Sequence, residues 1–133
     1  MLDRMFSTVN FLKLALDGTW LRHEAISNNI ANANTPGYKK ITVEFEDILK
    51  ENLENKSIKL KVTNELHIKS QHSNLGPRVI KQMNTSTRLD GNNVNIDIEM
   101  ANLAKNTIMY NALIRQTVSE FSRIKSVINE GRR

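Results

Sequence analysis

Residues 27–40 read SNNIANANTPGYKK and join a helix-like pattern before them to a strand-like pattern after them. Asparagine side chains bond nearby backbone groups and tolerate left-handed backbone, so this stretch favours the end of a helix. Pro36 disfavours helical backbone at the residue before it, and Gly37 adopts positive φ at little cost. The pair predicts a type II turn that places Tyr38. An ordinary helix-ending turn would explain the Pro-Gly pair but not the four asparagines.

The residues before this turn predict a long amphipathic helix. From Leu2 to about Ala31 apolar side chains recur at steps of three or four, which is the spacing of one helix face. Gly18 lies in its middle and costs about 1 kcal/mol against Ala in a helix interior, so it marks a soft point or a close approach. We expect the following residues to form the seam, the line of side chains that faces a partner helix: Met5, Val9, Leu12, Leu16, Ile26 and Ile30.

A second long helix is predicted at the other end of the chain. Asn95 or Asp97 is the expected cap, and Gly131 is the expected stop. The apolar spacing again follows steps of three or four through Thr107 and Thr117. The predicted seam of this helix consists of Leu103, Tyr110, Ile114, Phe121, Ile124 and Ile128.

Between the helices, residues 34–94 predict the turn and a small β-containing insert. Alternating apolar residues indicate an extended start near residue 41, followed by a short helix over 44–54. Strands are predicted over 58–62 and 79–83, where apolar residues alternate with lysines or other polar residues.

The predicted fold is mainly α, with long N- and C-terminal helices paired as an antiparallel coiled-coil-like hairpin. Residues 1–33 and 95–133 would be the helices of the core domain, and 34–94 the insert. Each helix carries a second apolar flank that a single partner helix would leave in water. We therefore expect a subunit that polymerises into a helical tube. The alternative is a soluble bundle whose flanks the insert covers.

Composition limits the possible functions. The 133 residues carry a formal charge of +5. Six basic residues balance six acidic ones over 1–50, against seven and four over 51–90 and six and four over 91–133. No segment is a strong basic block, which favours a solvated surface over phosphate binding.

The chain has no cysteine, so disulfides and thiolate metal sites are excluded. No apolar run is long enough to span a membrane, and no cleavable signal is evident, so we expect no direct membrane insertion.

The histidines and acidic clusters predict no catalytic, cofactor or metal site. His23 lies in the first seam, where a partly buried structural histidine is the favoured interpretation, and His67 and His72 have no metal-ligand spacing. The acidic cluster over 44–47 suits the solvated start of a helix better than a paired-carboxylate site. We therefore expect no enzyme and no cofactor.

A basic nucleic-acid-binding or adaptor protein is the alternative function. It would bind through lysines of the insert, but these are not interleaved with exposed aromatic residues, so we expect no nucleic-acid partner. The lysines concerned are Lys56, Lys59, Lys61, Lys69 and Lys81.

The run SNNIANANTPGYKK resembles the motif that follows the N-terminal helix in bacterial flagellar axial proteins, the rod, hook and hook-filament junction subunits. Residues 89–106, LDGNNVNIDIEMANLAKN, more specifically resemble the rod protein B family of the proximal rod. The resemblance implies that the motif residues set the exit from the first helix and pack between neighbouring subunits. These residues are Asn28, Asn29, Ile30, Ala31, Asn32, Asn34, Thr35, Pro36, Gly37 and Tyr38.

The resemblance also implies a location and partners. The chain would be a structural subunit of the flagellar basal-body rod, outside the cytoplasmic membrane after uncleaved export by the flagellar type III apparatus. Like subunits, other rod proteins and the adaptor that joins the rod to the membrane ring would contact it. The tube would transmit torque from that ring to the distal rod and hook.

Overall fold

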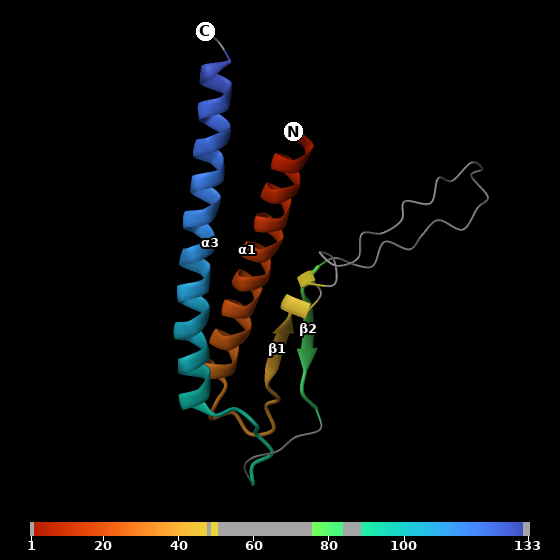
Figure 1. Cartoon of the computed structure of the whole chain (residues 1–133). Coiled ribbons are helices and arrows are strands. Elements are labelled where there is room, and N and C mark those ends of the chain that lie inside the picture. Colours follow the sequence, from red (N-terminus) through yellow and green to blue (C-terminus); the bar gives the residue numbers. More distant parts are fainter. Residues whose placement is uncertain (1, 48, 51–75, 84–88, 132–133) are drawn as a thin grey trace, which may run out of the picture.

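Two long helices lie side by side in a computed structural model, which describes residues 2–47, 49–50, 76–83 and 89–131. Helix α1 (Leu2–Ala31) and helix α3 (Ile96–Glu130) run antiparallel and contact each other (Figure 1). Strands β1 (Ile41–Glu44) and β2 (Arg78–Lys81) form a small antiparallel sheet, of which β1 contacts α1. The predicted fold, a helical hairpin with a small β-containing insert, is confirmed.

The start of α3 is fixed by a side-chain cap. Asn95 has extended backbone, and its Oδ1 accepts hydrogen bonds from the backbone N–H of Asp97 at 2.9 Å and of Ile98 at 3.3 Å. These N–H groups have no partner within the helix, so the cap satisfies them. Asp97 in the first turn also interacts favourably with the helix dipole. The predicted cap at Asn95 is confirmed.

The insert differs in detail from the prediction. Pairing runs from Ile41 opposite Lys81 to Glu44 opposite Arg78, so β2 begins one residue earlier than predicted and ends two residues sooner. Because β1 occupies residues up to Glu44, the short helix predicted from residue 44 begins only at Glu46. The strand predicted over 58–62 lies outside the described residues.

A small apolar core joins the sheet to α1. Ala25, Val43 and Phe45 are buried together, with Leu21, Ile41 and Met109 packed against them. A Cβ placed on Gly18 would lie only 2.7 Å from Cγ and Cδ2 of Phe45. Gly18 is therefore a site of close approach, where the missing side chain lets the Phe45 ring lie against the helix backbone.

Arg22 ties α1 to the end of β1. Its guanidinium lies 4.5 Å from the centre of the Phe45 ring, and Nη2 donates to the carbonyl oxygen of Val43 at 3.0 Å. Both terminal nitrogens also bind the carboxylate of Glu46. The hydrogen bond from Arg22 lowers the pKa of Glu46 below its ordinary value.

Gly18→Ala should destabilise the fold by about 1–2 kcal/mol, because the overpacking against Phe45 outweighs the better helix propensity of Ala. Urea unfolding measures the change. Gly76→Ala is the matched control, since nothing lies within 4 Å of a Cβ there. Equal or greater stability of Gly18→Ala would contradict the close approach.

Stability should fall in acid partly through Glu46. A carboxyl group whose pKa is lowered by folding stabilises the native state above its unfolded pKa and loses that contribution as the pH falls through the folded pKa. Glu46→Gln should therefore lose less stability than wild type between pH 7 and pH 3, by up to about 1 kcal/mol for a partly exposed pair. Thermal unfolding across this range measures it, with exposed Glu44→Gln as control. Identical pH profiles of wild type and Glu46→Gln would count against the Arg22 pair.

Candidate functional site

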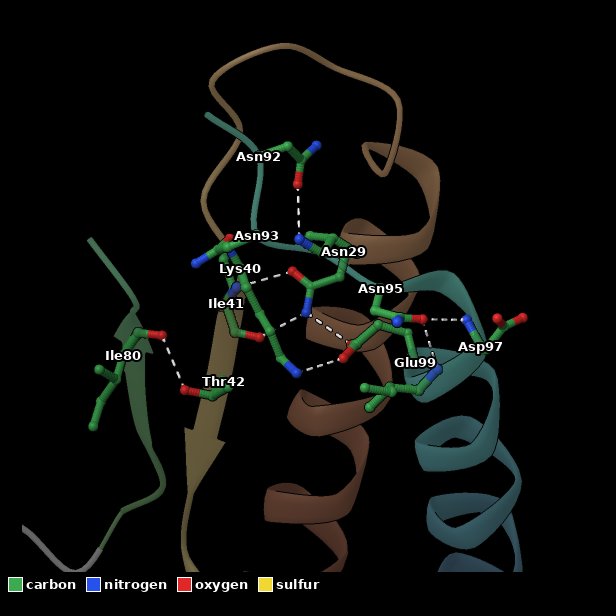
Figure 2. Close-up of polar contacts among 12 residues, drawn as sticks. Asn29, Lys40, Ile41, Thr42, Ile80, Asn92, Asn93, Asn95, Asp97 and Glu99 are labelled. Atoms are coloured by element: carbon green, nitrogen blue, oxygen red, sulfur yellow. Dashed lines mark hydrogen bonds and ion pairs between the residues drawn. The ribbon is translucent and has the colours of Figure 1, made fainter. Parts of the chain in front are cut away.

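The motif at the end of α1 meets two other segments in a polar cluster (Figure 2). One segment leads into β1 over residues 38–41, and the other leads into α3 over residues 90–95. We call this cluster the asparagine joint. It consists of Asn29, Tyr38, Lys40, Asn92, Asn93 and Glu99.

Asn29 is the centre of the joint and is 0% exposed. Its Nδ2 donates to the carbonyl oxygen of Ile41 at 2.8 Å, and its Oδ1 accepts from the N–H of the same residue at 2.9 Å. One side-chain amide thus bonds both backbone groups of the first residue of β1, as a neighbouring strand would. Oδ1 also accepts from the Tyr38 hydroxyl at 3.2 Å, and Nδ2 also donates to Oε2 of Glu99 at 3.0 Å.

Glu99 brings α3 into the joint. It lies in the first turn of α3 and is buried, and its Oε1 forms an ion pair with Nζ of Lys40 at 2.6 Å. A buried carboxylate is tolerated when a cation and hydrogen-bond donors compensate it, and Lys40 and Asn29 supply both. Burial, together with the negative charge of Glu99, raises the pKa of Tyr38, so its hydroxyl stays a hydrogen-bond donor.

Asn92, which lies in the segment before α3, contacts the residues that follow the end of α1. It is fully buried, and its Nδ2 lies 3.2, 3.0 and 2.9 Å from the carbonyl oxygens of Asn32, Ala33 and Thr35. The carbonyl oxygens of Asn32 and Thr35 also accept from backbone N–H groups, so this amide adds a side-chain donor at all three and ties the residues after α1 to the segment before α3. Its Oδ1 accepts from the N–H of Val94 at 2.8 Å.

Asn93 connects the two strands of the insert to the same place. Its Oδ1 accepts from the N–H of Lys40 at 2.7 Å, and its Nδ2 donates to the carbonyl oxygen of Gln82 at 3.1 Å. The side chain of Asn93 therefore holds both the residue before β1 and the residue after β2.

The Pro-Gly turn has the predicted geometry. Gly37 has a φ of 71°, and the N–H of Tyr38 donates to the carbonyl oxygen of Thr35 at 3.3 Å, as in a type II turn. The N–H of Gly37 bonds the carbonyl oxygen of Asp90 at 2.9 Å, and Gly91 also has positive φ. None of the described asparagines has positive φ. The asparagines therefore act through side-chain hydrogen bonds, and the expected use of left-handed backbone is wrong for them.

The predicted motif residues differ in exposure. Asn29 is buried, Ile30, Asn32 and Tyr38 are half-buried, and the rest are exposed. Sequence reasoning missed Lys40, Asn92, Asn93 and Glu99 as partners of the motif. The asparagines at 92, 93 and 95 before the second helix were the available signal. The exposed members are Asn28, Ala31, Asn34, Thr35, Pro36 and Gly37.

The predicted seams are only partly enclosed in the single chain. Leu12 and Ile26 are buried, and the Met5 side chain lies outside the described part. Two polar residues are also buried between the helices, Thr19 and Asn106, and Asn106 donates through Nδ2 to the carbonyl oxygen of Thr19 at 2.9 Å. Half-buried seam residues are Val9, Leu16, Ile30, Leu103, Tyr110 and Ile124, and exposed ones are Ile114, Phe121 and Ile128.

Among the histidines and insert lysines named from the sequence, the structure describes His23 and Lys81, and both are exposed. Within residues 2–47, 49–50, 76–83 and 89–131, no three His, Asp or Glu side chains lie close enough to hold a metal ion. His23 is exposed, contrary to the expected partial burial, and it lines a groove between α1 and α3. Of the insert lysines, only Lys81 lies within the described residues. Neither long helix has an apolar stretch that could cross a membrane.

Asn29→Asp should destabilise the fold by about 3 kcal/mol, because it removes the donor to Ile41 and places a second carboxylate beside Glu99. Asn34→Asp, a change at an exposed asparagine of the same motif, should alter stability by less than about 0.5 kcal/mol. Urea unfolding of both variants tests the joint. Similar losses in the two variants would show that Asn29 has no special role.

Known proteins share both the motif and the length of this chain. A family model described as flagella basal body rod protein matches residues 21–39, the end of α1 and the turn. Over 125 residues the chain is 32% identical to the flagellar basal body rod protein FlgB of Bacillus subtilis, covering 94% of this chain and 95% of that protein. The FlgB proteins of Proteus mirabilis strain HI4320 and Salmonella typhimurium are 31% and 30% identical, and each alignment covers 98% of this chain and 99% or more of the relative. The chain therefore belongs to the FlgB family of flagellar basal body rod proteins.

Proposed function

We propose that this chain is a structural subunit of the proximal rod of the flagellar basal body and polymerises through α1 and α3 into a helical tube. Its similarity to rod proteins over nearly its whole length carries this proposal. The chain is a structural protein rather than an enzyme. Within the tube, residues 1–33 and 95–133 serve as the core domain and 34–94 as the insert.

The outer surface of α3 supports assembly. Ile114, Val118, Phe121 and Ile128 follow one another at steps of four, three and seven residues, so they share one side of the helix, and all are exposed, Val118 at 59% and Phe121 at 54%. Apolar side chains gathered along one helix in this way are typical of a protein–protein interface. A contact between two different surfaces of like subunits does not have to close, and repetition then builds an open helical assembly.

The offset between the two helices along their length also supports assembly of subunits. Asn106 lies opposite Thr19, and the antiparallel helices leave the last turns of α3 beyond the start of α1 (Figure 1). Val127 and Ile128, in these last turns, are 57% and 60% exposed. Neighbouring subunits would cover these turns in the rod.

The partners follow from this place in the flagellum. The chain contacts like subunits and other rod proteins, and it contacts the adaptor that joins the rod to the membrane ring. It passes through the flagellar export apparatus without cleavage and lies outside the cytoplasmic membrane. The exposed motif residues, Asn34 and Pro36 among them, face neighbouring subunits, while Asn29 acts inside its own subunit.

Deleting this chain from the source organism tests the proposal. Electron cryotomography should then show membrane rings without a rod, and re-expression should restore the rod and motility. Intact rods in the deletion strain would contradict the proposed function.

Phe121→Asp should separate folding from assembly. Because Phe121 is exposed in the single chain, the free energy of unfolding should change by less than about 0.5 kcal/mol, whereas re-expression of the variant should restore few or no rods. Gln116→Asp, at an exposed position of α3 about 140° away from Phe121 around the helix, is the control and should restore motility. Full motility with Phe121→Asp would exclude this side chain from a subunit contact.

A further inference from the structure

A groove of about 290 Å³ runs between α1 and α3 and is lined only by residues of these two helices. Asn106 lies at its inner end and is 3% exposed. Aromatic side chains form two of its walls, Trp20 from α1 and Tyr110 from α3. The remaining lining residues are Thr19, His23 and Thr107.

Asn106 has one hydrogen-bonding group that is not used. Its Nδ2 donates to the carbonyl oxygen of Thr19, but its Oδ1 is buried and has no hydrogen-bond partner among the described residues. A buried amide oxygen without a donor is unfavourable, so this position calls for an incoming N–H or O–H group.

The walls of the groove indicate which kind of donor enters. Trp20 is the only tryptophan of the chain, and it is 61% exposed. Among the residues that the structure describes, no aspartate, glutamate, lysine or arginine lines the groove. Aromatic faces beside an amide oxygen suit a guanidinium group, which stacks on aromatic rings and donates several hydrogen bonds in one plane.

A second cavity that Asn106 also borders, about 310 Å³ in volume, does not suit such a donor. It lies on the side of β1, and Arg22, Lys40 and Lys105 line it together with Glu46 and Glu99. Glu46 is already paired with Arg22 and Glu99 with Lys40, so the lining keeps an excess of positive charge that disfavours a guanidinium, and the Trp20 groove is the better entry for the donor. The oxygen is covered, and a long flexible side chain reaches it by displacing the exposed indole.

Arg115 has the matching chemistry on another face of the chain. It is exposed, and no ion pair or hydrogen bond to it occurs among the described residues. Small or aliphatic exposed residues surround it along one face of α3, so another helix can approach this face closely. These neighbours are Ala101, Ala104, Ile108, Ala112, Ser119 and Ser122.

Arg115 cannot fill the groove of its own subunit. Nine residues separate it from Asn106 on α3, which places the two side chains about 180° apart around the helix and about 13 Å apart along it. Arg115 can therefore fill this groove only in a second copy of the chain.

We propose that Arg115 of one subunit enters the Trp20 groove of the next, stacks on Trp20 and donates a hydrogen bond to Oδ1 of Asn106. This contact rests on the proposed function, because it joins like subunits within the rod. Arg115 and the groove are different surfaces of one chain, so the contact is heterologous and repeats along an open assembly.

Engineered cysteine pairs test the contact, because the natural chain has no cysteine. His23→Cys combined with Ala112→Cys, or with Ser119→Cys, brings one cysteine to the groove and one beside Arg115. Expressed in the deletion strain and mildly oxidised, one of these pairs should give cross-linked dimers and higher multimers. His23→Cys with Lys125→Cys is the matched control, since Lys125 lies about 80° away from Arg115 around the helix. Motile cells whose test pairs cross-link no more than the control would overturn the proposal.

If the cysteine variants do not assemble, substitutions of Arg115 test the contact instead. Arg115→Ala should weaken subunit association about tenfold or more, Arg115→Lys should restore part of it, and Lys125→Ala should change it less than about twofold. Trp20 emission should shift to the blue when wild-type chain associates and not in Arg115→Ala. Normal rods and motility with Arg115→Ala would refute this contact but leave the rod function intact. Failure of the wild-type chain itself to restore the deletion strain would instead refute the proposed function.

Discussion

The fold depends on one buried amide. Asn29 bonds the N–H and the carbonyl of Ile41 and also the carboxylate of Glu99, so a single side chain fastens the end of α1 to the start of β1 and to the first turn of α3. Asn29 and Glu99 are buried, so leaving their polar groups without a partner would destabilise the fold. Lys40 neutralises the carboxylate that the amide contacts. The three segments therefore stabilise one another, and removal of any one leaves polar groups of the others unsatisfied.

This polar joint explains how a chain with few aromatic residues holds two long helices together. The buried apolar core is small and lies mainly around Phe45, where Gly18 lets the ring reach the helix backbone. Farther along the helix pair there is again a polar contact, from Asn106 to Thr19. Large apolar side chains such as Phe121 lie outside this core. A subunit built in this way keeps its apolar surface for its neighbours, as a polymerising protein requires.

Local patterns predicted the elements whose causes are local. The spacing of apolar residues located both helices, and Pro36 with Gly37 predicted the type II turn, because propensity and turn chemistry act over a few residues. Local patterns predicted only part of the asparagine joint, because Asn29 and Glu99 are 70 residues apart and no local rule pairs them. Apolar spacing also did not distinguish the face of α3 that contacts α1 from the face beside it. Ile114 and Phe121 consequently lie exposed, while the polar Asn106 is buried.

Amide hydrogen exchange of the purified chain, followed by NMR, tests the central role of the joint most directly. The N–H groups of Lys40, Ile41 and Val94 each donate to an asparagine side chain rather than to a strand or helix partner. If the joint holds the subunit together, these amides should exchange as slowly as the best protected amides of α1, and protection in α3 should decline toward Glu130. Rapid exchange of these three amides while both helices stay protected would show that the helices pair without the joint.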